Sequence, residues 1–283
     1  MNKQLISIAV VTYNSSQMVI DTLESVKAQT YSAIELIVSD DCSTDNTLIV
    51  VREWIAKNKD RFVDVKLLSS DENKGIAPNR NKCVREASGE WIKFLDSDDL
   101  LTSQAIESYA SAINEKIHFI IGNYIPFNEE GEKTIEKNRI TLPTLILRKK
   151  TFEQLGGFDE RFPMLEDYPF FHKAKKAGYI FDWIDEPIVY YRMHLGSIQL
   201  TPRFHLSHVN YINQVIVPDY LKEKKYIDYW HDKLWSEKEL AKINNQPVKV
   251  FFIYLLMLIS DTKEWYYIMR DKIYRLIVLK WRG

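Results

Sequence analysis

The chain has 283 residues, of which 46% are apolar and 27% charged, and its formal net charge is −1. This length suits one large domain or a domain with an appendage, and the apolar content argues against global disorder. A net charge near zero argues against general nucleic-acid binding, and two cysteines, Cys42 and Cys83, favour a reducing compartment over a disulfide framework or a zinc site. The N-terminal apolar run is too short for a secretory signal, and no stretch reaches the roughly 18 apolar residues of a membrane span.

The first hundred residues alternate between apolar runs and helical patterns. The β-branched run 6–12 predicts a strand buried on both faces, and apolar residues at helical spacing predict a helix within 15–29. Further strands are expected at IELIVSDD, VDVKLLSS and WIKFLDSDD. Helices are expected at STDNTLIVVREWIAKN, with Ser43 or Thr44 as the N-cap, and at GIAPNRNKCVREAS. This order is typical of βαβ units and predicts an α/β fold with a mostly parallel sheet.

Three of the expected strands end in polar clusters: Thr12-Tyr13-Asn14, Asp40-Asp41 and Asp96-Ser97-Asp98. Because the carboxyl ends of parallel strands share one edge of a sheet, these clusters should meet there. Crowded carboxylates repel one another, and their removal from water costs several kcal/mol per ion. Either a surface turn or a divalent cation therefore has to explain the run DSDD.

Asp96 and Asp98 have the spacing of a DxD pair, which suits a hard cation such as Mg²⁺ or Mn²⁺. The alternative is an acidic turn in which Asp99 caps the next helix. Asp41 can accept the N–H of a uracil-like base or hold a ribose hydroxyl, and the alternative for its segment is helix capping. The choice between these alternatives depends on what surrounds the acids.

Four further groups complete the candidate set. Arg80 has forked donors that suit a diphosphate, although a lone arginine is usually solvated. Glu166-Asp167 lies among aromatic residues, and partial desolvation would suit a carboxylate there to general-base work; the alternative is an acid at a helix start. His194, beside Arg192, is a candidate third metal ligand or phosphate donor, and a structural histidine is the alternative.

Seven segments in this order resemble family-2 glycosyltransferases of the GT-A fold over about residues 5–200: VVTYN, IVSDDCSTDNT, NKGIAPNRN, GEWIKFLDSDD, LGGFDERF, EDYPFF and YRMHLGS. The resemblance implies a Rossmann-like, mixed and mostly parallel sheet flanked by helices. It also implies a nucleotide-sugar donor, usually UDP-linked, and a role in bacterial polysaccharide assembly.

The resemblance also implies roles for the site residues. Asp167 matches the general base of an inverting displacement, with Glu166 beside it. Asp98 matches the more direct ligand of a Mn²⁺ or Mg²⁺ ion, and the Gly156-Gly157 loop matches the segment leading to the acceptor. The expected metal set is Asp98, Asp96 and His194, and the expected nucleotide-sugar set is Thr12, Tyr13, Asn14, Asp41, Arg80, Asp96 and Arg192.

Cys42 departs from the family pattern, which usually has glycine after the paired acids. If that position needs a positive φ, cysteine would be strained there. Two rival functions fit the sequence less well. A metal-dependent nucleotidyltransferase would show a Gly-rich, basic N-terminal signature, which VVTYNSSQMV lacks, and a non-catalytic nucleotide- or carbohydrate-binding scaffold would have lost key acids that are all present here.

The pattern changes near Thr201-Pro202, which predicts a catalytic domain over 1–201 and a mostly helical region over 202–283. Residues 263–283 hold six Lys/Arg and two Asp/Glu, interleaved with Trp and Tyr. Such a segment suits the face of an anionic membrane, with a lipid-linked glycan acceptor at the inner face of the plasma membrane. The alternative is a cytoplasmic helical appendage that packs on the core or on a second subunit of a homodimer.

Overall fold

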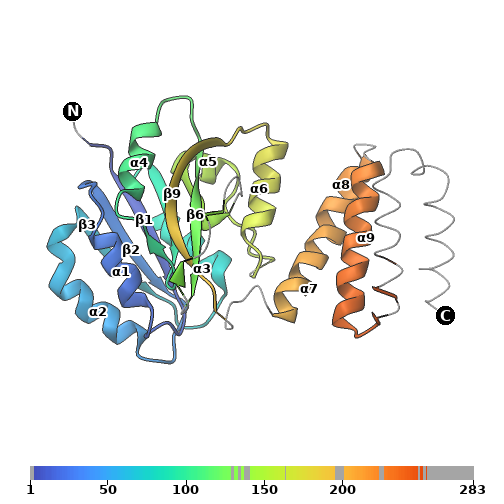
Figure 1. Cartoon of the computed structure of the whole chain (residues 1–283), viewed down its shortest axis with the longest axis horizontal. Helices are drawn as coiled ribbons and strands as arrows, with labels where there is room; N and C mark the ends of the chain where they lie inside the picture. The colour runs from blue at the N-terminus through green and yellow to red at the C-terminus, as the bar shows by residue number, and fades with distance from the viewer. Residues whose placement is uncertain are drawn as a thin grey trace. The chain divides into compact units, whose positions relative to one another are not determined.

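The computed structural model describes residues 3–128, 131–132, 135–136, 141–162, 164–194, 201–222, 226–247, 249–250 and 253. The chain divides into two compact units, Met1–Leu195 and Gly196–Gly283. Figure 1 shows the strands in the first unit and only helices among the labelled elements of the second.

The first part of unit 1 follows the expected alternation of strands and helices. Its elements are β1 (Ile6–Thr12), α1 (Val19–Lys27), β2 (Ile34–Asp40), α2 (Thr47–Asn58), β3 (Asp64–Ser69), α3 (Ile76–Glu86) and β4 (Trp91–Asp96). The expected N-cap of α2 was wrong, because Asn46 occupies that position. The Ser43 hydroxyl instead donates to Asp40, at 2.5 Å, so it is already engaged at the end of β2.

The remainder of unit 1 extends the same sheet with antiparallel and parallel strands. Its elements are β5 (Leu100–Leu101), α4 (Ala105–Ala112), β6 (Phe119–Asn128), β7 (Gly131–Glu132), β8 (Leu145–Arg148), α5 (Lys149–Gln154), α6 (Asp167–Lys176) and β9 (Asp182–Arg192). Within the described residues the sheet order is β3-β2-β1-β4-β8-β6-β9-β5, with β7 paired to β6. Strands β3, β2, β1 and β4 are mutually parallel, whereas β8 is antiparallel to both neighbours and β5 is antiparallel to β9. The sheet is therefore mixed and mostly parallel, as expected.

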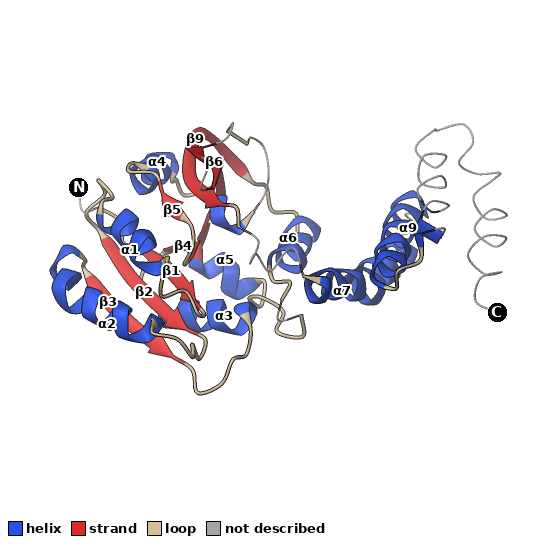
Figure 2. Cartoon of the chain, turned by 60° about the horizontal axis from the view of Figure 1, so that its bottom comes forward, coloured by secondary structure: helices blue, strands red, loops and turns tan. Residues whose placement is uncertain are grey.

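Helices cover both faces of the sheet. On one face α1, α2 and α4 pack against residues such as Ile8 and Val10, and on the other α3, α5 and α6 pack against Ala9 and Val11 (Figures 1 and 2). Burial of both faces explains why β1 reads as a continuous apolar run. Each fully buried Val, Leu or Ile contributes about 1.5–3 kcal/mol, so the two clusters make the sheet a rigid platform for its edge.

Unit 2 consists of helices in its described part. They are α7 (Pro202–Tyr211), a π-helical segment (Ile212–Ile216), α8 (Val217–Lys222) and α9 (Tyr226–Ile243). The Thr201 hydroxyl accepts the Phe204 N–H at the start of α7, and α9 contacts both α7 and α8. Among the described residues, no helix is both long and apolar enough to span a bilayer. The basic segment 263–283 lies outside the described residues.

Candidate active site at the carboxyl edge of the sheet

The three polar strand ends meet at one edge of the sheet. In the parallel ladders Thr12 is the partner of Asp40, and Val11 is the partner of Asp96. The register therefore confirms that β1, β2 and β4 end side by side, with their polar residues at the same edge.

Asp40 and Asp41 hold the loops around this edge. Asp40 accepts the Thr12 hydroxyl at 2.8 Å and the Ser43 N–H at 2.8 Å. Asp41 accepts the N–H groups of Lys74 and Gly75, at 3.0 and 2.8 Å, just before α3 begins. Both acids are almost fully buried, so their backbone bonds compensate the lost hydration. The Asp41 carboxylate thereby fixes the loop that leads into α3.

The loop after Asp41 contains Cys42, where the sequence predicts strain if the backbone has a positive φ. Cys42 has a φ of 63°, in the left-handed region that favours glycine. Its thiol lies 3.5 Å from the carbonyl oxygen of Asp71. Asn14, on the facing loop, also has a positive φ of 49°, and its N–H donates to the Ser43 hydroxyl at 2.9 Å. Tyr13 is half exposed beside it.

Arg80 joins two of the acidic motifs. It lies on α3 with its side chain 2% exposed, and its two terminal nitrogens donate to Glu166 and to Asp96. Burial disfavours the charged guanidinium, but the charges of Asp96 and Glu166 outweigh that effect and raise the pKa of Arg80. The arginine thus holds the DxD turn against the Glu166-Asp167 pair.

The paired acids at the start of α6 have different surroundings. Burial raises the pKa of Glu166 to about 7, against the opposing charge of Arg80. Burial also raises the pKa of Asp167, whose Oδ1 accepts the Tyr168 N–H at 2.6 Å. The Glu166 carboxylate is buried and paired with Arg80, whereas Asp167 is only half-buried. Of the two, Asp167 is the carboxylate that a substrate can reach.

Asp98 lies between His194 and Arg192. The His194 Nε2 is 2.9 Å from Asp98 Oδ2, and the Arg192 Nε donates to the Asp98 carbonyl at 2.7 Å. Burial and the charge of Asp96 raise the pKa of Asp98, against the effect of His194. The end of β9 is therefore joined to the DxD turn.

The donor set at this turn fits a hard divalent cation. Asp96 and Asp98 both keep about a quarter of their side-chain surface exposed, and their charges repel each other. Within the described part of the chain, no group of three or more His, Cys, Asp or Glu residues is arranged to enclose a metal. Such a pair suits an ion that takes one or two carboxylates and completes its shell with substrate phosphates and water.

Two further charged residues lie in this region: Lys93, which had no expected role, and Asp99, which was expected only as a possible helix cap. Lys93 is fully buried on β4, where its ammonium donates to the carbonyls of Phe94, at 2.8 Å, and Pro143. Burial lowers the pKa of Lys93 to about 7. Asp99 is also buried, and it is not a helix cap, since the segment after it is β5. The sequence feature that could have pointed to Lys93 is its position in the middle of the apolar run WIKFL.

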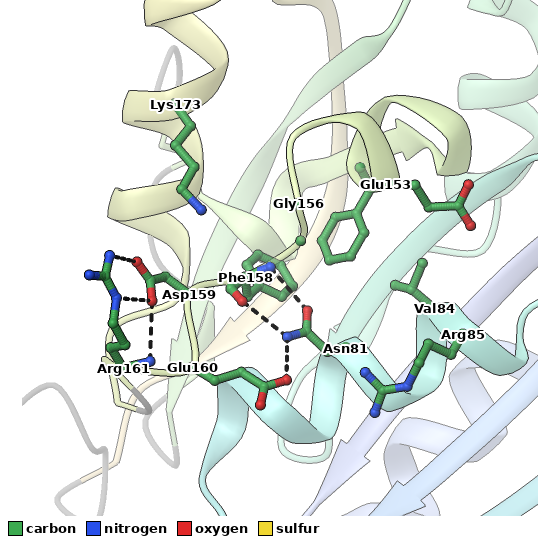
Figure 3. A pocket seen from close by; sticks show the side chains of 12 residues that line it. Asn81, Val84, Arg85, Glu153, Gly156, Phe158, Asp159, Glu160, Arg161 and Lys173 are labelled. Atoms are coloured by element: carbon green, nitrogen blue, oxygen red, sulfur yellow. Dashed lines mark hydrogen bonds and ion pairs between the residues drawn. The ribbon is translucent and has the colours of Figure 1, made fainter.

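A hollow of about 710 Å³ lies beside the Gly156–Arg161 loop. Its floor is formed by buried Val84, Phe152 and Phe158, with the Asn81 amide bonded to the Phe158 N–H and carbonyl, both at 3.0 Å. Figure 3 shows Lys173 extending from α6 and Arg85 from α3 on opposite sides of this floor. None of Asp96, Asp98, Glu166 and Asp167 lines the hollow, although α3 and α6 contribute to both.

Solved structures with the same fold include two that were determined with a bound nucleotide sugar. TarS from S. aureus, residues 1–349 in complex with UDP-GlcNAc, has a TM-score of 0.63 and 19% identity, covering 98% of this chain and 91% of that one. The mannosyltransferase PcManGT from Pyrobaculum calidifontis, in complex with GDP-Man and Mn²⁺, has a TM-score of 0.63 and 16% identity, covering 99% and 87%. With the sheet order, these similarities confirm the GT-A fold.

Relatives by sequence are glycosyltransferases. An uncharacterized glycosyltransferase of Haemophilus influenzae is 28% identical, covering 88% of this chain and 89% of its own. The UDP-Glc:alpha-D-GlcNAc-diphosphoundecaprenol beta-1,3-glucosyltransferase WfgD of Escherichia coli is 35% identical, covering 52% of this chain and 56% of its own. The family described as "Glycosyl transferase family 2" matches residues 7–181, which is more than half of the chain. The chain therefore belongs to glycosyl transferase family 2 and is a glycosyltransferase.

Proposed function

We propose that the chain transfers a sugar from a nucleotide donor, UDP-linked, to a hydroxyl of a glycan or lipid-linked glycan, with inversion at the anomeric carbon. The observation that carries this proposal is the Arg80 bridge, which joins Asp96 of the DxD turn to Glu166 beside Asp167. The bridge therefore places the proposed donor-binding turn close to the residue next to the candidate base. The proposal is also supported by TarS, whose structure was solved with UDP-GlcNAc.

The donor is expected at the ends of β1, β2 and β4. The base and ribose would lie by Thr12, Tyr13, Asn14 and Asp41, where the loop is fixed by buried carboxylates. Arg192 is the cation proposed to approach the diphosphate, because its guanidinium remains about a quarter exposed. Both terminal nitrogens of Arg80 already meet carboxylates, which favours a supporting role over direct contact with phosphate.

Asp167 is the proposed general base. In a single in-line displacement, the acceptor oxygen forms a bond to the anomeric carbon while the bond to the diphosphate breaks, and the acceptor proton passes to Asp167. A positioned base is typically worth about 10²–10⁴ in rate. Burial suits Asp167 to this work because a carboxylate with a raised pKa holds a proton better.

Asp98 and Asp96 would hold the Mn²⁺ or Mg²⁺ ion, and His194, the third residue of the expected set, lies against Asp98. When bound, the ion supplies positive charge that neutralises the leaving diphosphate. The chain's own contribution is to present the two carboxylates at a strand end with His194 fixed against Asp98. The Gly156-Gly157 loop and the hollow beside it are proposed to lie on the acceptor side.

The last part of the proposal concerns location. We propose that the protein works at the inner face of the plasma membrane as a peripheral protein. The support is the sequence of residues 263–283, with its surplus of four basic residues and interleaved aromatics.

The proposed function is tested by incubating the purified full chain with a panel of UDP-, GDP- and dTDP-sugars and Mn²⁺. Slow release of the nucleoside diphosphate from one donor is expected. Release of pyrophosphate from a nucleoside triphosphate and sugar phosphate would instead identify a nucleotidyltransferase. Donor binding without release, with every acceptor class supplied, would identify a non-catalytic scaffold.

A further inference from the structure

Asp99 is a buried carboxylate that the proposed chemistry does not use. Its side chain is 1% exposed, and its N–H closes the DxD turn by donating to the Asp96 carbonyl at 3.2 Å. Its Oδ1 accepts the Arg192 N–H at 2.8 Å. Among the described residues, its Oδ2 has no hydrogen-bond partner. Burying a carboxylate with one oxygen unpartnered is costly, so the bond that its other oxygen accepts from Arg192 is the contact to explain.

The bond to Arg192 occurs where a short ladder ends. Strands β5 and β9 pair antiparallel through only two positions, Leu100 with Tyr190 and Leu101 with Val189. The Arg192 N–H lies beyond the last of these pairs, and the Asp99 carboxylate takes the place of a ladder acceptor there. Without that acceptor, the N–H would lose its partner at the point where the chain leaves the sheet.

A second bond, also donated by Arg192, exchanges the roles of side chain and backbone. The Arg192 Nε donates to the Asp98 carbonyl at 2.7 Å, while the Asp99 side chain accepts the Arg192 N–H. Each segment thus contributes one side chain and one backbone group, which is a reciprocal pair like that of a helix capping box. We name these two bonds the Asp99–Arg192 clasp. Reciprocal bonds restrict both the distance and the rotation of the two segments.

The clasp lies directly beside the Asp98–His194 contact. His194 is two residues beyond Arg192, and its Nε2 meets Asp98 Oδ2 at 2.9 Å. Asp98 therefore takes part in both the clasp and this contact, and His194 follows the clasp by two residues. We propose that Asp99 is a positioning residue that sets His194 against Asp98 through the Arg192 N–H; this rests on the proposed function of Asp98 in donor binding.

Three variants of the full chain test the proposal. Asp99→Ala removes the acceptor, Asp99→Asn keeps a carbonyl oxygen for the Arg192 N–H, and Asp21→Asn is the matched control. Asp21 also approaches Arg192, at 3.6 Å, but it is exposed and belongs to neither the clasp nor the site. Should Asp99→Ala fail to fold, Asp99→Ser serves as the second variant, because its hydroxyl ends one bond closer to the backbone.

The first measurement is made on metal-free protein without donor. We expect amide exchange at Arg192 to become roughly tenfold faster or more in Asp99→Ala, with the His194 ring signals shifted in the NMR spectrum. Asp99→Asn and Asp21→Asn should retain the wild-type exchange rate and ring signals. Unchanged exchange in Asp99→Ala, or Asp99→Asn behaving like Asp99→Ala, would overturn the proposal.

The second measurement is Mn²⁺ affinity in the presence of UDP, followed by the electron paramagnetic resonance of free Mn²⁺. Loss of a residue that orients a ligand typically costs about 10–100-fold in metal affinity, so a loss of roughly tenfold is expected for Asp99→Ala and little change for Asp99→Asn. Wild-type affinity in Asp99→Ala would overturn the positioning role. If the wild-type protein binds no Mn²⁺ with UDP, the proposed function fails, whereas the exchange measurement still decides the clasp.

Discussion

Cys42 occupies a left-handed backbone conformation inside the loop that carries Asp40 and Asp41. Its φ of 63° is costly for any residue with a Cβ, by about 1–2 kcal/mol. Next to it, both oxygens of Asp41 accept the N–H groups of Lys74 and Gly75. The strain is therefore local to the proposed base-binding loop.

We expect Cys42→Gly to stabilise the protein by about 1 kcal/mol, because glycine removes the Cβ that opposes a positive φ. For a chain of this size, that gain would raise the melting temperature by about 2–4 °C. Cys42→Ala is the matched control, since it removes the thiol but keeps the Cβ, and it should bring no gain. Equal melting temperatures for the glycine and alanine variants would show that φ is not the cause.

Asp167 and Glu166 should differ when each is neutralised. We expect Asp167→Asn to lower kcat by about 10²-fold or more while donor affinity stays near the wild-type value, because only proton transfer is lost. Glu166→Gln should also weaken donor binding, since it leaves Arg80 with one carboxylate fewer. Turnover assays and calorimetric donor titrations measure the two effects. Near-normal turnover in Asp167→Asn would exclude Asp167 as the general base.

The pH dependence of activity follows from the same carboxylate. Burial raises the pKa of Asp167 above its usual value, and a general base must be ionised to act. Activity should therefore fall as the pH drops through that raised pKa, and the acidic limb of kcat/KM should lie above the pH range of an exposed aspartate. A profile from about pH 4 to 8 measures the limb. Any residual activity of the Asp167→Asn variant should not show this acidic limb.

Helix α3 is the element that holds the site together. Arg80 reaches Asp96 and Glu166 from one position, and the neighbouring Asn81 binds the backbone of Phe158 through both its amide nitrogen and its oxygen. The segment from 157 to 166 is thus attached to α3 near both of its ends. Because Asp167 begins the helix that follows this segment, α3 determines where the candidate base lies.

Gly156 and Gly157, at the start of this loop, allow the cost of backbone strain to be distinguished from the cost of steric crowding. Gly156 and Gly157 have φ values of 79° and 68°, but a Cβ on Gly156 would meet nothing within 4 Å. A Cβ on Gly157 would lie 3.0 Å from the Asn81 Oδ1 and 3.2 Å from the Phe152 ring.

We therefore expect Gly156→Ala to cost about 1 kcal/mol from backbone strain and Gly157→Ala about 2 kcal/mol or more. Urea unfolding of both variants measures the difference. Equal losses would mean that Asn81 and Phe152 yield without cost, and the close packing between α3 and the loop would then contribute little to stability.

At the scale of the whole molecule, the candidate site residues lie in Met1–Leu195 and the basic C-terminal segment belongs to Gly196–Gly283. We expect the full chain to float with liposomes that contain anionic lipid, and to do so less at high salt, because basic residues are drawn to an anionic surface within a Debye length. Neutral liposomes are the control. A version that ends before Val248 should stay at the bottom of the gradient, and equal behaviour of the two versions would contradict the membrane proposal.

The sequence by itself determined the alternation of strands and helices and the sheet edge at which polar residues meet. These features depend on local periodicity and on the common direction of parallel strands, and both can be inferred from the residue pattern of one sequence. Only the tertiary structure decided the partners of Arg80, because Asp96 and Glu166 lie 16 and 86 positions away along the chain. It also decided that Cys42 has a positive φ and that Asp99 binds the Arg192 N–H 93 positions away. The physical reason is the same in each case: a side chain's type limits what it can bind, but packing between distant segments selects which partner it meets.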